Sequence, residues 1–197
     1  MHTIIGIKYV SITSGSTTLF LMGTLISALM YSALFFLNDR LTEVIKYDLG
    51  VSWIYLPAGL RLFLILIFGL AGAVGIAVAS FAISYFGIFQ PDLVTCIGIG
   101  LISGFAPLLA KWIVVSNISI NTDLSNLSLQ KIVFCVVMYA FMSAGLHQIW
   151  FELRGLESGS LNHFLVMFVG DIAGSILLIA VIKYSIDLLK RSKPRQG

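Results

Sequence analysis

The chain has 197 residues, of which 58% are hydrophobic and 11% charged, and its mean hydropathy is +1.00. Soluble domains carry about 25% charged residues, and a water-soluble fold of this length cannot bury so much apolar surface. The composition therefore excludes a soluble protein and predicts one integral membrane domain over residues 1–197. The net charge of +3 comes from a C-terminal lysine and arginine cluster, which indicates membrane topology and not a nucleic-acid site.

Six stretches are long and apolar enough for membrane helices, since a span needs about 20 mostly apolar residues. The expected fold is all-α, a polytopic membrane bundle of about six transmembrane helices. The second and third stretches form one continuous run, which we divide at a glycine turn near Gly69–Gly72. In chain order the predicted helices cover residues 17–37, 51–68, 70–89, 93–115, 131–151 and 161–189.

Lysine and arginine are unequally distributed between the two sides of this predicted bundle. An even number of helices places both termini on one side, and that side collects seven of these residues against three on the other. Positively charged loops stay in the cytoplasm, so both termini are predicted to be cytoplasmic. The seven are Lys8, Lys111, Lys131, Lys190, Arg191, Lys193 and Arg195.

Arg61 lies inside an apolar run, where a charge costs about 3 kcal/mol or more and calls for a partner or a wet cavity. Asp171 is the acidic residue best placed to be that partner. If both helices enter from the outer side, each residue lies roughly 15 Å deep. We hypothesise that the two pair or that both line one polar cavity, which makes them a candidate ligand site. A structural ion pair that only fixes helix register is the equal alternative.

The step Pro57-Ala58-Gly59 comes just before Arg61. Proline within a helix frees a carbonyl one turn back, here at Trp53, and glycine allows close approach. Pro57 and Gly59 therefore join the candidate ligand site as a break in a ligand-facing helix. An ordinary kinked helix has the same pattern.

His147 is a further candidate for the polar site, near the outer end of the fifth predicted helix. Its neighbour Trp150 is typical of the aromatic belt at a membrane interface. Interfacial anchoring is thus the favoured interpretation of His147, ahead of ligand binding or pH sensing. Trp53 and Tyr55 have the same interpretation at the start of the second helix.

Small residues recur at four-residue spacing in several predicted helices, which lets helix backbones approach closely. Gly75 and Ala79 form such a pair, and Gly170 and Gly174 form another. These four residues are predicted helix-packing positions.

No motif of a catalytic triad, zinc protease, P-loop or dinucleotide site occurs, and the three histidines lie in separate segments. The sequence therefore predicts a protein that is not an enzyme and has no metal or cofactor.

Two segments resemble signature motifs of the MASE1 membrane sensor domain. "SWIYLPAGLRLFLILIFG" is similar to the family's tryptophan-proline-proline-alanine-glycine stretch and the helix that follows it. "MFVGDIAGSILLI" is similar to its late tryptophan-x-Gly-Asp-x-x-Gly helix, in the same order and at a similar separation. The resemblance covers roughly residues 51–186 and implies that Pro57, Ala58, Gly59, Asp171 and Gly174 occupy signature positions.

This resemblance implies a bacterial inner-membrane sensor that passes a signal to an output domain. The chain departs from the family pattern at Leu56, where a first proline is usual, and it has fewer helices than the usual eight or so. Since no kinase or cyclic-dinucleotide domain follows the last helix, we expect any output to lie on a separate signalling partner.

A second family is also similar. Substrate-binding subunits of energy-coupling-factor vitamin transporters have six helices, and a glycine- and alanine-rich helix like "LIFGLAGAVGIAVAS". Their first helix docks a coupling subunit through small residues, which Ala28 and Ser32 match loosely. This resemblance implies a small-molecule-binding transporter subunit. A structural or assembly protein without a ligand fits the composition as well.

Overall fold

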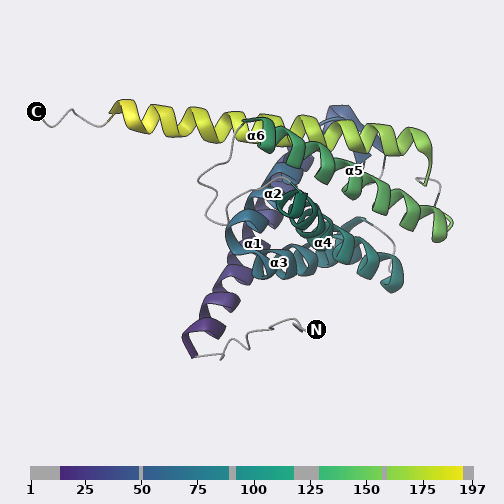
Figure 1. The fold of residues 1–197 in the computed structure, drawn as a ribbon. Helices are drawn as coiled ribbons and strands as arrows, with labels where there is room; N and C mark the ends of the chain where they lie inside the picture. The colour runs from purple at the N-terminus through teal and green to yellow at the C-terminus, as the bar shows by residue number, and fades with distance from the viewer. Residues whose placement is uncertain (1–13, 49–50, 89–91, 118–128, 157–158, 193–197) are drawn as a thin grey trace, which may run out of the picture.

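The computed structural model describes residues 14–48, 51–88, 92–117, 129–156 and 159–192. These residues form six α-helices that pack as an all-α bundle, which confirms the predicted fold class (Figure 1). The helices are α1 Ser14–Leu41, α2 Leu56–Phe68, α3 Leu70–Ile83, α4 Leu93–Asn117, α5 Leu129–Leu153 and α6 Leu161–Ser192. The charged tails at residues 1–13 and 193–197, on which the predicted orientation partly rests, lie outside the described residues.

Five of these helices are long and apolar enough to cross a membrane, so the chain is a multi-pass membrane protein. The exception is α2, whose 13 residues extend about 20 Å, less than the hydrocarbon thickness. The predicted helix over 51–68 is therefore wrong in its first part. Val51–Ser52 forms strand β2, which pairs antiparallel with β1, Lys46–Asp48.

The start and the end of α2 both follow from local sequence. Pro57 lies in its first turn, where the missing N–H has no helical partner to lose. The predicted break in a running helix is thus wrong, because Pro57 helps to begin the helix. At the other end Gly69 has φ +55°, and α3 begins at the next residue. This confirms the predicted turn, since glycine adopts positive φ without a Cβ clash.

The third predicted helix covers residues 70–89, but the α-helix α3 ends at Ile83. It changes at Ser84 to a π-helical turn, Ser84–Ile88, while residue 89 lies outside the described residues. Single π-helical turns within α-helices are frequent at functional sites.

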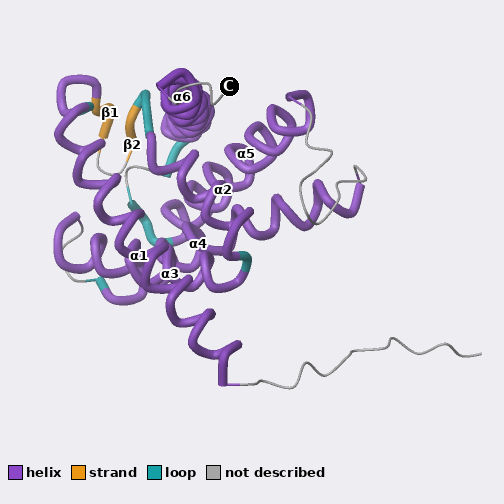
Figure 2. Tube along the Cα trace, turned by 90° about the vertical axis from the view of Figure 1, so that its left-hand side faces the viewer, coloured by secondary structure: helices purple, strands orange, loops and turns teal. Residues whose placement is uncertain are grey.

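Small residues hold the helices close together. A methyl group added at Gly75 would overlap the Thr24 carbonyl of α1, and one added at Gly104 of α4 would overlap the Ala73 carbonyl of α3. Accordingly α3 packs against both α1 and α4, and Figures 1 and 2 show α1 crossing α3 steeply. Ala79 is buried in a core cluster to which α1, α2 and α3 all contribute side chains.

The extended residues before α2 pack on the glycine face of α6, which Figure 2 shows end-on beside the strands. The Tyr55 amide donates to the Gly170 carbonyl at 3.0 Å, and the Leu56 amide donates to Asn38 Oδ1 at 2.9 Å. Irregular backbone at membrane depth is stable only when protein groups satisfy it. Gly170 and Gly174 allow this contact, because a methyl group at either would overlap the carbonyl of Ser52 or Tyr55.

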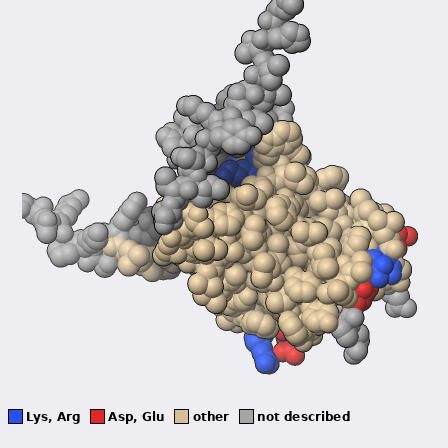
Figure 3. All heavy atoms as spheres, turned by 90° about the horizontal axis from the view of Figure 1, so that it is seen from below, with Lys and Arg blue, Asp and Glu red and all other residues tan. Residues whose placement is uncertain are grey.

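Ion pairs of the described residues gather at one end of the bundle, where α1, α3 and α5 end and α2, α4 and α6 begin. We name this the hairpin end, because it carries β1 and β2. The pairs are Asp39–Lys46, Asp92–Arg154 and Asp48–His163. Figure 3 shows a face of the molecule that is largely uncharged, with charged groups at its margins, as expected for a surface in contact with lipid.

Asp92 joins the beginning of α4 to the end of α5. It accepts from Arg154 Nη2 at 2.7 Å and from the Val94 amide at 3.2 Å, and it also bonds the Thr95 hydroxyl. The Arg154 hydrogen bond, followed by that from Thr95, lowers the pKa of Asp92 from 3.8 to about 2.

We expect the stabilisation by Asp92 to be complete above about pH 4 and lost as the pH falls through 2. The folded state binds this proton less readily than the unfolded chain, so acid favours unfolding. Thermal unfolding of the detergent-solubilised protein between pH 4 and pH 2 measures the effect. Asp92→Asn should lower the midpoint at neutral pH and flatten its decline in acid. An unchanged acid decline in the variant would contradict the assignment to Asp92.

Candidate functional site

Arg61, the buried cation of α2, is enclosed by tyrosines from α1, from α5 and from the segment before α2. Its Nη2 donates to the hydroxyls of Tyr55 at 2.8 Å and Tyr31 at 3.0 Å, and its Nη1 makes a longer contact of 3.5 Å with Tyr139. The two closer hydroxyls are 3.0 Å apart. The guanidinium carbon lies 5.2 and 5.0 Å from the ring centroids of Tyr31 and Tyr55, within the range of cation–π attraction.

We name Tyr31, Tyr55 and Tyr139 the tyrosine cage. It explains how Arg61 can be buried, with 3% of its surface exposed. Phenol oxygens accept its hydrogen bonds and the ring faces attract its charge, so part of the lost hydration is replaced. The replacement is incomplete, because Arg61 Nε is buried without a hydrogen-bond partner. The cage therefore has a spare donor on a positively charged group.

Asp171 is fully buried on α6, but no ion pair of the described residues joins it to Arg61. The predicted direct pairing is therefore wrong. Neither carboxylate oxygen has a hydrogen bond of ordinary geometry, and the Ser143 hydroxyl is the side-chain group that lies close enough to act on it. Arg61 still acts on Asp171 electrostatically, and Asp171 acts on the cage residue Tyr139. Asp171 thus balances the buried cation from a distance.

His147 is buried on α5, with 2% of its surface exposed, so the favoured interpretation as an interfacial anchor is wrong. Its Nδ1 lies 2.8 Å from the Ser143 carbonyl, and its Nε2 lies 3.4 Å from the hydroxyl of Ser103. Ser103 in turn receives a hydrogen bond of 2.9 Å from Ser80. A short polar chain therefore runs from α5 through α4 to α3.

Arg61 and His147 line one small cavity of about 40 Å³, which we name the chamber. A cavity of this size can hold water or a small polar group, since one water needs roughly 10–15 Å³ of such volume. Asp171 does not line the chamber. The polar residues that do so are Tyr31, Tyr55, Arg61, Ser80, Ser84, Ser103 and His147.

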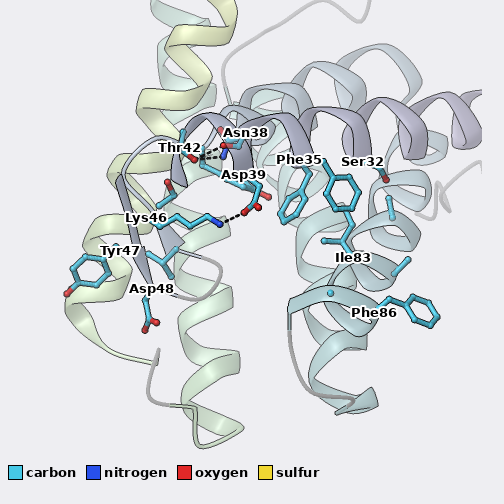
Figure 4. A pocket seen from close by; sticks show the side chains of 17 residues that line it. Ser32, Phe35, Asn38, Asp39, Thr42, Lys46, Tyr47, Asp48, Ile83 and Phe86 are labelled. Carbon is cyan, nitrogen blue, oxygen red and sulfur yellow. Dashed lines mark hydrogen bonds and ion pairs between the residues drawn. The ribbon is translucent and has the colours of Figure 1, made fainter. Parts of the chain in front are cut away.

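A much larger cavity of about 720 Å³, which we name the groove, opens at the hairpin end between α1, the strands and α3 (Figure 4). Figure 4 shows Phe35 and Ile83 beside it, with Lys46 extended toward Asp39 on the other side. Phe35, Tyr55 and Ile83 line both the groove and the chamber. The two cavities therefore adjoin at these three side chains.

The two residues predicted from the proline-glycine step position the site without lining it. Pro57 and Gly59 are buried in α2, and neither borders the chamber. A methyl group at Gly59 would come within 2.8 Å of the Ser175 Cα, so Gly59 brings α2 close to α6. This contact sets the place of Arg61 two residues later.

Sequence reasoning missed the cage tyrosines and Ser103. Tyr31 and Tyr139 lie in the middle of long apolar helices, far from the interfaces where tyrosine is common. That position was a usable signal for an internal polar cluster. The predicted interfacial anchoring of Tyr55 is wrong, since its hydroxyl bonds Arg61.

Comparison with protein-family models, with curated proteins and with solved structures found no match to this chain.

Proposed function

We propose that this chain is a non-enzymatic, multi-pass membrane sensor that binds a small molecule in the chamber and groove beside Arg61. The observation that carries the proposal is the buried Arg61, which lines a cavity adjoining an open groove and has an Nε donor without a partner. Burial of an ionisable group inside a membrane costs free energy. A buried cation with an unused hydrogen-bond donor therefore indicates a functional site.

The resemblance to MASE1 sensor domains supports the sensing role. Its two motif segments, more than a hundred residues apart, lie against each other here: Gly174 contacts the Tyr55–Leu56 peptide and Gly59 contacts Ser175. The motif residues thus form the scaffold that places Arg61. We further propose that the protein lies in a bacterial inner membrane, with both termini in the cytoplasm, and that it signals through a separate partner.

The alternative of an energy-coupling-factor transporter subunit depends on free small residues on α1. In this bundle two of the small residues on α1, Gly23 and Ala28, pack against other helices. A methyl group at Gly23 would lie 3.2 Å from Ala71 and Phe68, and Ala28 packs on the core cluster shared by α1, α2 and α3. Ser32 borders the groove. The sensor proposal is therefore preferred.

A pull-down of the tagged full chain in mild detergent tests the function, with mass spectrometry of small molecules and proteins. We expect a small molecule that copurifies with the wild type and with Arg40→Met, whose parent arginine is exposed on α1, but not with Arg61→Met. A copurifying kinase or cyclase supports signalling. A coupling ATPase complex overturns the sensor role, and ligand-free wild type overturns the binding role.

A further inference from the structure

The groove and the chamber differ in character. Apolar side chains from α1 and α3, namely Phe35, Phe36, Ala79 and Ile83, line much of the groove, and Phe86 follows at the end of α3. Polar groups of the hairpin end, among them Asn38 and Lys46, line its other side (Figure 4). A volume of about 720 Å³ is within the range of small-molecule sites.

The chamber can receive only the end of a molecule, because its volume is about 40 Å³. That end must be polar, since serine hydroxyls, His147 and the Arg61 guanidinium line the wall. A ligand that occupies both cavities is therefore amphipathic, with a compact polar head and an apolar body.

Hydrogen-bond counting at the cage defines the charge of this head. Arg61 Nε–H is unused, whereas the neighbouring Nη2 already donates to Tyr31 and Tyr55, so this edge of the guanidinium offers one N–H to a carboxylate oxygen. Tyr31 and Tyr55 have two hydroxyl hydrogens, of which their mutual bond uses one. A free phenol hydrogen thus accompanies the free N–H.

Asp171 acts on Arg61 only from a distance and does not line the chamber, so direct contact with Arg61 is open to a ligand with a single negative charge. No carboxylate of the described residues contacts Arg61, and at the groove Asp39 and Lys46 neutralise each other at 2.5 Å. One guanidinium complements a monoanion, whereas a phosphate dianion is usually held by more than one cation or helix N-terminus. The planar carboxylate fits the head best.

The apolar walls favour an aromatic body. Phe35 has edge-to-face contacts with Phe36 and with Tyr55, at ring-centroid distances of 5.6 and 6.5 Å. A further ring in this cluster would make the same offset or edge contacts, which add about 0.5–1.5 kcal/mol to the burial of the ring. The groove also opens at the hairpin end, where the ion pairs lie, so a water-borne acid can reach it.

We propose that the ligand is a small aromatic monocarboxylate, whose carboxylate enters the chamber to bond Arg61 while its ring lies in the groove against Phe35. This rests on the proposed function and names its ligand class. Phe35 and Tyr55 border both cavities, so the ligand must pass between them or displace them.

The test compares phenylacetate with phenylacetamide, its uncharged analogue, and with octanoate, a lipid-like acid. Each is titrated into the purified full chain, and the shift of the thermal unfolding midpoint reports binding to the folded state. We expect phenylacetate to raise the midpoint in a saturable way and phenylacetamide to have at least tenfold lower affinity. Equal shifts with acid and amide overturn the carboxylate assignment, and no shift with phenylacetate overturns the proposal.

Variants locate the binding. Arg61→Met should abolish the phenylacetate shift, Phe35→Ala should weaken it, and Arg40→Met should retain it. If Arg61→Met does not fold, the acid–amide comparison still tests the carboxylate assignment, and Phe35→Ala still tests whether the ring lies in the groove. A response to octanoate alone assigns the groove to a lipid-derived acid and overturns the aromatic class.

The two proposals can fail separately. A neutral molecule that copurifies with the wild type and is lost in Arg61→Met keeps the binding function and refutes the carboxylate. If no small molecule copurifies and no acid shifts the midpoint, both proposals fail.

Discussion

Replacement of Gly174 by alanine should lower the free energy of unfolding by about 1–3 kcal/mol, the usual cost of forcing an extra methyl group into a packed core. The added methyl group would overlap the backbone carbonyl of Tyr55, which cannot move without disturbing the Tyr55 amide bond to Gly170. Because Tyr55 also bonds Arg61, ligand binding should weaken together with stability.

The matched control is Gly145→Ala on α5. A methyl group there would approach only Phe164 Cε2, at 3.9 Å, which is ordinary contact. Alanine also favours helix over glycine by about 1 kcal/mol, so this variant should equal or exceed the wild type. Thermal unfolding in detergent compares the two variants. Equal midpoints would show that the approach of the extended segment to α6 is looser than the structure describes.

Replacement of Arg61 by methionine should lower the free energy of unfolding by about 3–5 kcal/mol, the cost typical of leaving a buried charge uncompensated. Asp171 is fully buried without an ion-pair partner, and Arg61 is the cation that acts on it. The cage hydroxyls of Tyr31 and Tyr55 would also lose their donor.

A double-mutant cycle measures the coupling between the two charges. Asp171→Asn in the Arg61→Met background should recover part of the lost stability, with a coupling of about 0.5–3 kcal/mol. The swap of Arg61→Asp with Asp171→Arg should not restore the wild-type midpoint, because an arginine on α6 lacks the tyrosine cage. Full restoration by the swap would instead demonstrate a direct pair. Arg40→Met again serves as the control for the loss of an exposed arginine.

The site illustrates how far a sequence can locate intramembrane chemistry. Arg61, Asp171 and His147 were identifiable because a charged or titratable side chain is conspicuous in an apolar run. Their partners were not identifiable in the same way. The cage tyrosines come from α1, α5 and the segment before α2, and nothing in a single sequence states which helices are neighbours.

The start of α2 shows a second limit. Residues 51–55 are apolar, so their composition is compatible with a helix, and hydropathy cannot distinguish a helix from an extended segment covered by protein. The deciding contacts are the Gly170 carbonyl and the Asn38 side chain, which lie far away in the chain and satisfy the extended backbone. That alternative becomes favourable only once α1 and α6 are in place.

By itself the sequence determined that the chain is an all-α membrane bundle, where most helices lie, and that Gly69 turns the chain between α2 and α3. These properties depend on the length of each apolar segment and on the conformational freedom of one glycine. Both can be read from residues that are neighbours in the chain. Only the tertiary structure decided that Arg61 bonds tyrosines and has no direct bond to Asp171, and that His147 is internal. Those outcomes depend on which side chains from separate helices meet at one depth, because a buried charge takes whichever polar partners the packing brings within hydrogen-bonding distance.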